Sequence, residues 1–146
     1  MPRRMIYKNM LLPLDGSEEA EKRVDEAASL VKLTNGELIL FRVVDVSPFR
    51  GQDIDEEFRI RKGRYEKYLN GIKTRIESEG VRVKIVIVPG KPADEICKYA
   101  ARDEVDIVLV SPHGAGGILG MTLGSVAYKV ARQSSKPVLV IRHAIE

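Results

Sequence analysis

The apolar run VDIVLV (105–110) and the segment SPHGAGGILGMTLGS (111–125) that follows it decide the fold of this chain. The run is short and almost entirely apolar, which predicts a buried strand. A helical pattern follows the segment, from Val126 to Ser134. A strand, a glycine-rich loop and a helix N-terminus in this order form a natural anion site, because glycines let the backbone approach a ligand and first-turn N–H groups have no partner within the helix. A surface loop in which glycine serves only turn geometry is an equally good interpretation of this segment alone.

The loop lacks the standard phosphate-binding motifs. The Walker motif G-x-x-x-x-G-K-[ST] is absent from the sequence, and a dinucleotide fingerprint G-x-G-x-x-G starting at Gly114 fails because its sixth position is Leu119. Other parts of the chain therefore have to identify the ligand.

The composition predicts a single domain, 1–146. The chain has 146 residues, of which 44% are hydrophobic, and this is enough for a substantial core. We expect no membrane span and no signal peptide, because the apolar runs are too short for either. The single cysteine, Cys97, excludes an internal disulfide framework and fits a reducing cytoplasm, and its helical context predicts a buried structural thiol. A net charge of +3 is too small to indicate nucleic-acid binding by itself.

Strand and helix patterns alternate along the chain. Apolar runs predict strands at 8–14, 37–44, 81–88, 105–110 and 138–142. Helical spacing and caps predict helices at 18–33, 54–79, 93–102 and 126–134, with Ser17 as the N-cap of the first. Helices between successive strands favour parallel pairing with right-handed crossovers. In the segment 81–88, charged residues alternate with apolar ones at the start, which is typical of an edge strand. The expected fold class is α/β: a doubly wound five-stranded parallel sheet sandwiched by helices.

Such a sheet binds ligands beyond the carboxyl ends of its strands, where the strand order reverses. If the strands 8–14 and 105–110 flank that point, Asp15 faces the loop that begins at Ser111. Asp15 can accept hydrogen bonds from a ribose hydroxyl or an exocyclic amine, although a turn aspartate that caps the following helix fits equally well. Together the two features predict a nucleotide slot, with Val43 and Val44 beside the base and the phosphates near the helix 126–134.

These residues carry a resemblance to the universal stress protein family, and in particular to its ATP-binding branch. The resemblance covers nearly the whole chain, in NMLLPLD (9–15), VVD (43–45), GKP (90–92), HG (113–114) followed by GSV (124–126), and KPVLVI (136–141). Nucleotide-binding members carry G-x-x-G-x(9)-G-[ST], of which Gly114, Gly124 and Ser125 are present here. Ser111, followed by Pro112, departs from the first glycine of the motif, a position that in the family lies against the ribose.

The resemblance implies a Rossmann-like fold of the adenine nucleotide alpha-hydrolase-like type that binds ATP, with any Mg²⁺ brought by the nucleotide. It places Pro13, Asp15, Val43 and Val110 around adenine and ribose, and Gly114, Gly124 and Ser125 at the phosphates. The complete set of expected ATP-binding residues is Pro13, Leu14, Asp15, Val43, Val110, Ser111, His113, Gly114, Gly116, Gly117, Gly124, Ser125 and Val126. Family members commonly form homodimers through the last strand, here 138–142.

The expected function is an ATP-binding regulatory or stress-response module with little or no catalysis. The alternative is a slow ATPase that acts as a nucleotide-dependent switch; it requires a water-positioning group, for which Asp15, His113 and Ser125 are the evident candidates, so no catalytic residue is assigned. An FMN-binding electron carrier fits less well, because the expected ligand loops contain Phe49 as their one aromatic residue.

We expect neither a protein-built metal site nor a nucleic-acid or membrane partner. His113 and His143 are the two histidines, and no H-x-x-x-H motif or cysteine cluster accompanies them. A basic cluster in the helix 54–79 is interpreted as a solvated face rather than a partner-binding patch. It consists of Arg59, Arg61, Lys62, Arg64 and Lys67.

Overall fold

The computed structural model describes residues 6–112 and 123–142. The strands are β1 (Met10–Pro13), β2 (Glu37–Val44), β3 (Arg82–Pro89), β4 (Ile107–Val110) and β5 (Val138–Val140). The helices are α1 (Glu18–Thr34), α2 (Gln52–Glu77), α3 (Pro92–Ala100) and α4 (Ser125–Gln133). All the predicted elements are present, and their bounds differ from the predicted ones by at most two residues, which is the usual uncertainty at helix and strand ends. No helix in the described ranges is long and apolar enough to cross a membrane.

The five strands form one parallel sheet in the order β3-β2-β1-β4-β5. β1 is central, with Met10 opposite Leu38 of β2 on one side and Ile107 of β4 on the other. The chain winds outward from β1 to β3 and then returns to β4. The strand order therefore reverses between β1 and β4, as predicted, and β3 is the predicted edge strand.

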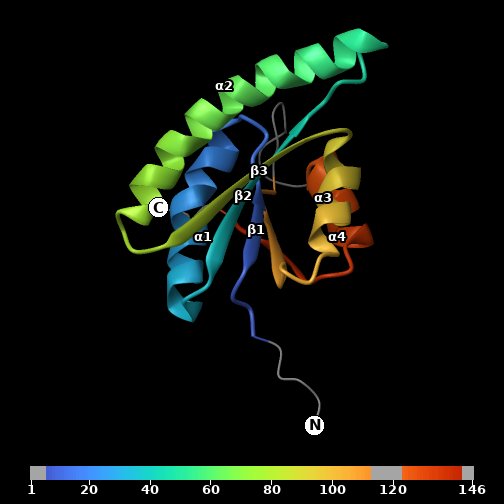
Figure 1. Cartoon of the computed structure of the whole chain (residues 1–146). Coiled ribbons are helices and arrows are strands. Elements are labelled where there is room, and N and C mark those ends of the chain that lie inside the picture. The colour runs from blue at the N-terminus through green and yellow to red at the C-terminus, as the bar shows by residue number, and fades with distance from the viewer. Residues whose placement is uncertain (1–5, 113–122, 143–146) are drawn as a thin grey trace.

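Helices cover both faces of the sheet: α1 and α2 lie on one face, α3 and α4 on the other (Figure 1). In β2, Leu38 and Leu40 belong to the core under α1 and α2, whereas Ile39 and Phe41 belong to the core under α3 and α4. Burial of each such side chain stabilises the fold by about 1.5–3 kcal/mol. This double coverage explains why the inner strands have nearly continuous apolar sequences.

Side chains close the edge of the sheet at which the strands begin. Asp106 Oδ2 accepts hydrogen bonds from the backbone N–H groups of Asn9 (2.8 Å) and Lys8 (3.1 Å). Asn9 Oδ1 in turn accepts one from the N–H of Glu37 (3.3 Å), so that β1, β2 and the start of β4 are joined. Asn9, the first residue of the stretch 9–15, therefore has a structural role far from the switch point.

Lys136 closes the same edge beside α3. Its Nζ donates to the carbonyl oxygens of Ala100 (3.2 Å), Arg102 (2.8 Å) and Val105 (2.7 Å), which lie at and beyond the C-terminus of α3. A cation at this position satisfies carbonyl groups that the helix leaves without partners. Lys136 thus fastens the chain that enters β5 to the end of α3.

The turn between β1 and α1 is defined by its side chains and by one glycine. Ser17 caps α1, as predicted, because its Oγ accepts from the N–H of Ala20 (3.1 Å). Gly16 has φ +85°, and a Cβ added there would lie 2.9 Å from Nη1 of Arg42. The positive φ favours glycine at position 16, and the missing side chain leaves room for the guanidinium of Arg42.

Candidate functional site

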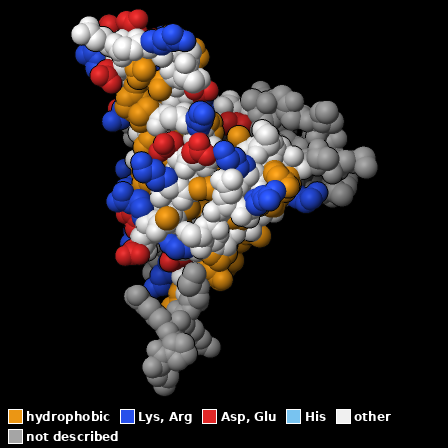
Figure 2. All heavy atoms as spheres, turned by 90° about the vertical axis from the view of Figure 1, so that its right-hand side faces the viewer, with side chains coloured by type: hydrophobic (Ala, Val, Ile, Leu, Met, Phe, Trp, Pro, Cys, Tyr) orange, Lys and Arg blue, Asp and Glu red, His pale blue; other side chains and the backbone are white. Residues whose placement is uncertain are grey.

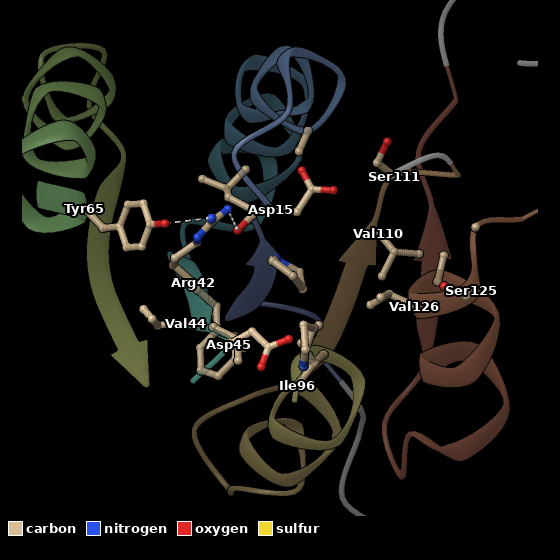
Figure 3. Close-up of a pocket in the computed structure, with 18 of the residues that line it drawn as sticks. Asp15, Arg42, Val44, Asp45, Tyr65, Ile96, Val110, Ser111, Ser125 and Val126 are labelled. Carbon is tan, nitrogen blue, oxygen red and sulfur yellow. Dashed lines mark hydrogen bonds between the residues drawn. The ribbon is translucent and has the colours of Figure 1, made fainter. Parts of the chain in front are cut away.

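A cavity of about 540 Å³ opens at the carboxyl edge of the sheet, between the ends of β1, β2 and β4 (Figure 3). Parts of α2, α3 and α4 complete its walls. Nine of the predicted site residues line this one cavity: Pro13, Leu14, Asp15, Val43, Val110, Ser111, Gly124, Ser125 and Val126. The other four, His113, Gly114, Gly116 and Gly117, lie outside the described residues.

The walls at the strand ends are largely apolar. Val43 lies next to the last residue of β2 and Val110 ends β4, and Ile96 of α3 and Val126 of α4 add further apolar side chains to the lining. The carbonyl of Val110 already accepts a hydrogen bond from the N–H of Ile141 (2.9 Å). It can therefore offer a ligand its second lone pair only, and shape and apolar contact carry more of the recognition here.

Two carboxylates point into the cavity, those of Asp15 and Asp45 (Figure 3). Oδ1 of Asp15 accepts from the N–H of Ser17 (2.9 Å), so Asp15 both shapes the turn and faces the cavity. Asp45 makes the same kind of turn with Ser47 (2.9 Å). Hydrogen bonds from Ser47, together with the positive charge of Arg61, hold the pKa of Asp45 below its usual value, so this carboxylate is ionised at neutral pH.

Within the described residues the N-terminus of α4 is bare. Its N-cap is Gly124, no side chain of the described chain caps the helix, and its first turn has no acidic residue. Each of the other three helices of the described chain has a side-chain cap or acidic residues in the first turn. Pro112 holds the approach to α4, because its carbonyl accepts from the N–H of Gly124 (2.7 Å). Free N–H groups and the positive end of the helix dipole make this end of α4 able to accept an anion.

Ser111 lines the cavity and directly follows the end of β4. Among the described residues Asn35 is the one non-glycine residue with a positive φ. Ser111 therefore adopts no backbone conformation that favours glycine, in agreement with its position before Pro112.

Arg42, Arg61 and Tyr65 also line the cavity, and sequence reasoning missed them as site residues. Arg42 donates from Nη1 to the carbonyl of Leu14 (3.2 Å) and from Nη2 to the hydroxyl of Tyr65 (3.2 Å), and its guanidinium lies 4.4 Å from the centre of the Tyr65 ring. The signal for Arg42 was its charge within the otherwise apolar stretch 38–44.

The basic cluster on α2 does not form one uniform solvated face. Arg61 pairs with Glu57 (2.8 Å), donates to the carbonyl of Asp45 (3.2 Å) and lines the cavity. Lys62 pairs with Glu66 (3.8 Å) on the surface. The interpretation of the cluster as solvated is therefore wrong for Arg61, because α2 extends over the carboxyl edge of the sheet (Figure 1).

Neither a metal cluster nor an activated thiol is found in the described ranges. No group of three or more His, Cys, Asp or Glu side chains is placed to hold a metal ion there. Cys97 is half-buried, and burial, followed by the nearby charge of Asp94, raises the pKa of its thiol. A raised pKa disfavours the reactive thiolate, so Cys97 fits the structural role that its context predicts, although it is less buried than expected.

The fold and the cavity define an α/β protein of the doubly wound type, with a cavity at its switch point. The family model described as the universal stress protein family matches residues 6–142. The chain therefore belongs to the universal stress protein family.

One relative is universal stress protein MJ0577 of Methanocaldococcus jannaschii. It is 33% identical in an alignment 156 residues long, which covers 94% of this chain and 96% of the relative. The solved structure of MJ0577 matches with a TM-score of 0.82 at 32% identity, over 97% of this chain and 99% of that chain. A universal stress protein in complex with cAMP matches with a TM-score of 0.71 at 24% identity, over 94% of this chain and 98% of that chain. The protein from Archaeoglobus fulgidus in complex with dAMP matches with a TM-score of 0.66 at 19% identity, over 94% and 99%. At these identities the last two show the shared fold.

Proposed function

We propose that this protein is an ATP-binding regulatory or stress-response module with little or no catalysis. The observation that supports this best is the order of features around the cavity: apolar strand ends, the carboxylate of Asp15, and the bare N-terminus of α4. An adenine nucleotide needs apolar walls for its base, an acceptor for its ribose hydroxyls and donors for its phosphates, in the same order. Two proteins of the same fold are complexes with cAMP and dAMP, both adenine nucleotides.

In this proposal the base lies beside Pro13, Val43 and Val110, and the ribose lies near Asp15 and Ser111. The phosphates lie against the backbone of Gly124 and Ser125. The glycine loop, with His113, Gly114, Gly116 and Gly117, completes the phosphate site, and Leu14 and Val126 add apolar contact. Any Mg²⁺ arrives with the nucleotide, as is usual for a cation that binds phosphates and few protein ligands.

Identification of the nucleotide that co-purifies with the protein tests this proposal directly. We expect acid release and mass spectrometry to yield an adenine nucleotide. Calorimetry on nucleotide-free protein should show clear preference for ATP over GTP, because the base slot is apolar and has few side-chain donors. Equal affinity for the two nucleotides would exclude the adenine assignment.

Turnover separates a binding module from the slow ATPase. Asp15 already uses one carboxylate oxygen to hold the turn at Ser17, so it is not free to act solely on a water molecule. We expect phosphate release from ATP to be very slow or absent. Sustained hydrolysis above roughly 1 per second, an ordinary enzymatic rate, would favour the ATPase.

We also propose a homodimer that forms through β5, in the cytoplasm. β5 ends the sheet, and its central residue, Leu139, is 41% exposed. An exposed apolar edge strand favours pairing with a second copy. Val140→Lys should give a folded monomer in light scattering. Leu139→Lys is a second variant that should also give a monomer, and it disturbs the core less because Leu139 is exposed, whereas Val140 packs against the core. A wild-type chain that remains monomeric at high concentration would exclude the dimer.

A further inference from the structure

A second cavity, of about 310 Å³, lies between the start of α1 and the middle of α2. It shares Leu14, Arg42 and Tyr65 with the cavity at the switch point but extends away from α3 and α4. Leu69 and the ring of Tyr68 add to its apolar surface. Its volume is within the range of sites that hold small molecules.

Positively charged side chains outnumber negatively charged ones in the lining of this second cavity. Arg42 and Arg64 line it together with one carboxylate, that of Glu21. Glu21 accepts a hydrogen bond from the hydroxyl of Tyr68, and burial, followed by this carboxylate, raises the pKa of Tyr68 to about 12. Tyr68 is therefore a neutral hydrogen-bond donor to the carboxylate of Glu21. Arg64 forms no ion pair within the described chain. The cavity carries a net positive charge.

Arg42 is held in place and has donors to spare. Two of its N–H groups bind the carbonyl of Leu14 and the hydroxyl of Tyr65, and its guanidinium lies against the Tyr65 ring. Its Nε is buried without a hydrogen-bond partner among the described residues. A guanidinium has five N–H donors in a fixed plane, which suits a planar carboxylate. Gly16 leaves room for this arrangement.

We propose that this second cavity is a site for a small aromatic carboxylate. Its ring packs against Tyr65, Tyr68 and Leu69, since aromatic rings prefer aromatic and apolar neighbours. Its carboxylate binds Arg42 and Arg64, because hydrogen bonds between arginine and a carboxylate are charge-assisted and geometrically matched. The proposal does not depend on nucleotide binding.

Nuclear magnetic resonance of the full chain without nucleotide tests the site with three probes of similar size and different charge: benzoate, benzyl alcohol and benzylamine. We expect benzoate to shift the amide signals of Gly16, Ser17 and Leu69 saturably, with a dissociation constant of about 1 mM or lower, as a ligand of this size permits. Benzyl alcohol and benzylamine should bind at least about tenfold more weakly. If benzyl alcohol, the neutral probe, or benzylamine, the cationic probe, binds as tightly as benzoate or more tightly, the proposal is overturned.

Two arginine variants on α2 complete the test. Arg64→Gln should weaken benzoate binding about tenfold, in line with the loss of one charge-assisted contact. Arg59→Gln is the matched control, because Arg59 is exposed on the same helix and lines neither cavity. Both positions are on the surface, so both variants should retain the wild-type spectrum. Unchanged affinity in Arg64→Gln, or an equal loss in both variants, overturns the proposal.

Discussion

Helices α3 and α4 resemble each other in length and position but differ in the charge of their first turns. Each has nine residues, both cover the same face of the sheet, and both begin at the cavity of the carboxyl edge. The ion pair between Asp94 and Lys129 (2.8 Å) joins them. Neither helix has a side-chain cap from the described chain, but the first turn of α3 contains Asp94 and Glu95, whereas that of α4 contains no acidic residue.

This difference is the reason why we expect the N-terminus of α4, and not that of α3, to accept an anion. The side chain of Glu95 packs so closely over Gly90 that a Cβ on Gly90 would lie 2.6 Å from its Cγ. The acids of α3 neutralise the positive end of its dipole from within the chain. The same end of α4 has neither an acidic residue nor a side-chain cap from the described chain. On this side of the molecule Lys and Arg side chains are interspersed with Asp and Glu rather than gathered in one patch, so the local first turn matters more than a general surface charge (Figure 2).

The largest expected effect is that of Gly124→Val, which blocks the N-terminus of α4. Its φ of −60° and ψ of 159° suit any residue, so we expect unchanged circular dichroism, with a small loss of thermal stability because valine is a poorer N-cap than glycine. A branched side chain where phosphates approach the backbone should weaken ATP binding at least about 100-fold in calorimetry. Ser111→Gly is the control, and it should change affinity by no more than about 1 kcal/mol. A harmless Gly124→Val would show that the ligand does not lie on α4.

Lys136→Met tests the other end of α3. It removes a cation that donates to three carbonyl groups, and we expect the free energy of unfolding in urea to fall by about 2 kcal/mol. Lys67→Met on the exposed surface of α2 should change it by less than about 0.5 kcal/mol. If both variants unfold at the same urea concentration, Lys136 does not fasten α3.

Ser125→Asp places an acidic residue in the first turn of α4, as in the first turn of α3. An acid there repels phosphate, so ATP affinity should fall about tenfold, while the helix itself gains about 0.3–1 kcal/mol of stability from its dipole. We therefore expect calorimetry to show weaker ATP binding and thermal unfolding to show a higher Tm. Ser125→Asn has nearly the same shape without the charge and should bind ATP more tightly than Ser125→Asp. Equal losses in the two variants would mean that charge is not the cause.

The smallest expected effect is that of Asp94→Asn, which breaks the contact between the two helices. The hydrogen bond from Lys129, followed by its charge, lowers the pKa of Asp94 below its ordinary value of 3.8. Because the pKa is lower in the folded state, the contact stabilises the protein above pH 3.8 and loses its effect as the pH falls through the folded pKa. We expect Asp94→Asn to lower Tm slightly at pH 7 and the difference to shrink below about pH 4. A Tm difference that persists in acid would point to packing instead.

Local patterns in the sequence determined the elements and the topology. The run 105–110, the cap at Ser17 and the alternation of strands with helices depend on neighbouring residues and on the periods of helix and strand, which are visible in one dimension. Parallel pairing then brings the carboxyl ends of β1 and β4 together, so Asp15 and Gly124 could be assigned to one cavity before any coordinates were known.

Only the tertiary structure decided what each polar side chain meets. Asn9 and Lys136 match the family as well as Asp15 does, yet they close the opposite edge of the sheet. Arg42 meets Tyr65, 23 residues further on, because α2 crosses over the end of β2. The sequence shows that Arg42 interrupts an apolar strand, but the partner of a side chain depends on the distance between packed helices. The pairing of Arg42, the cavity wall at Arg61 and the second cavity are therefore products of packing, which no local pattern encodes.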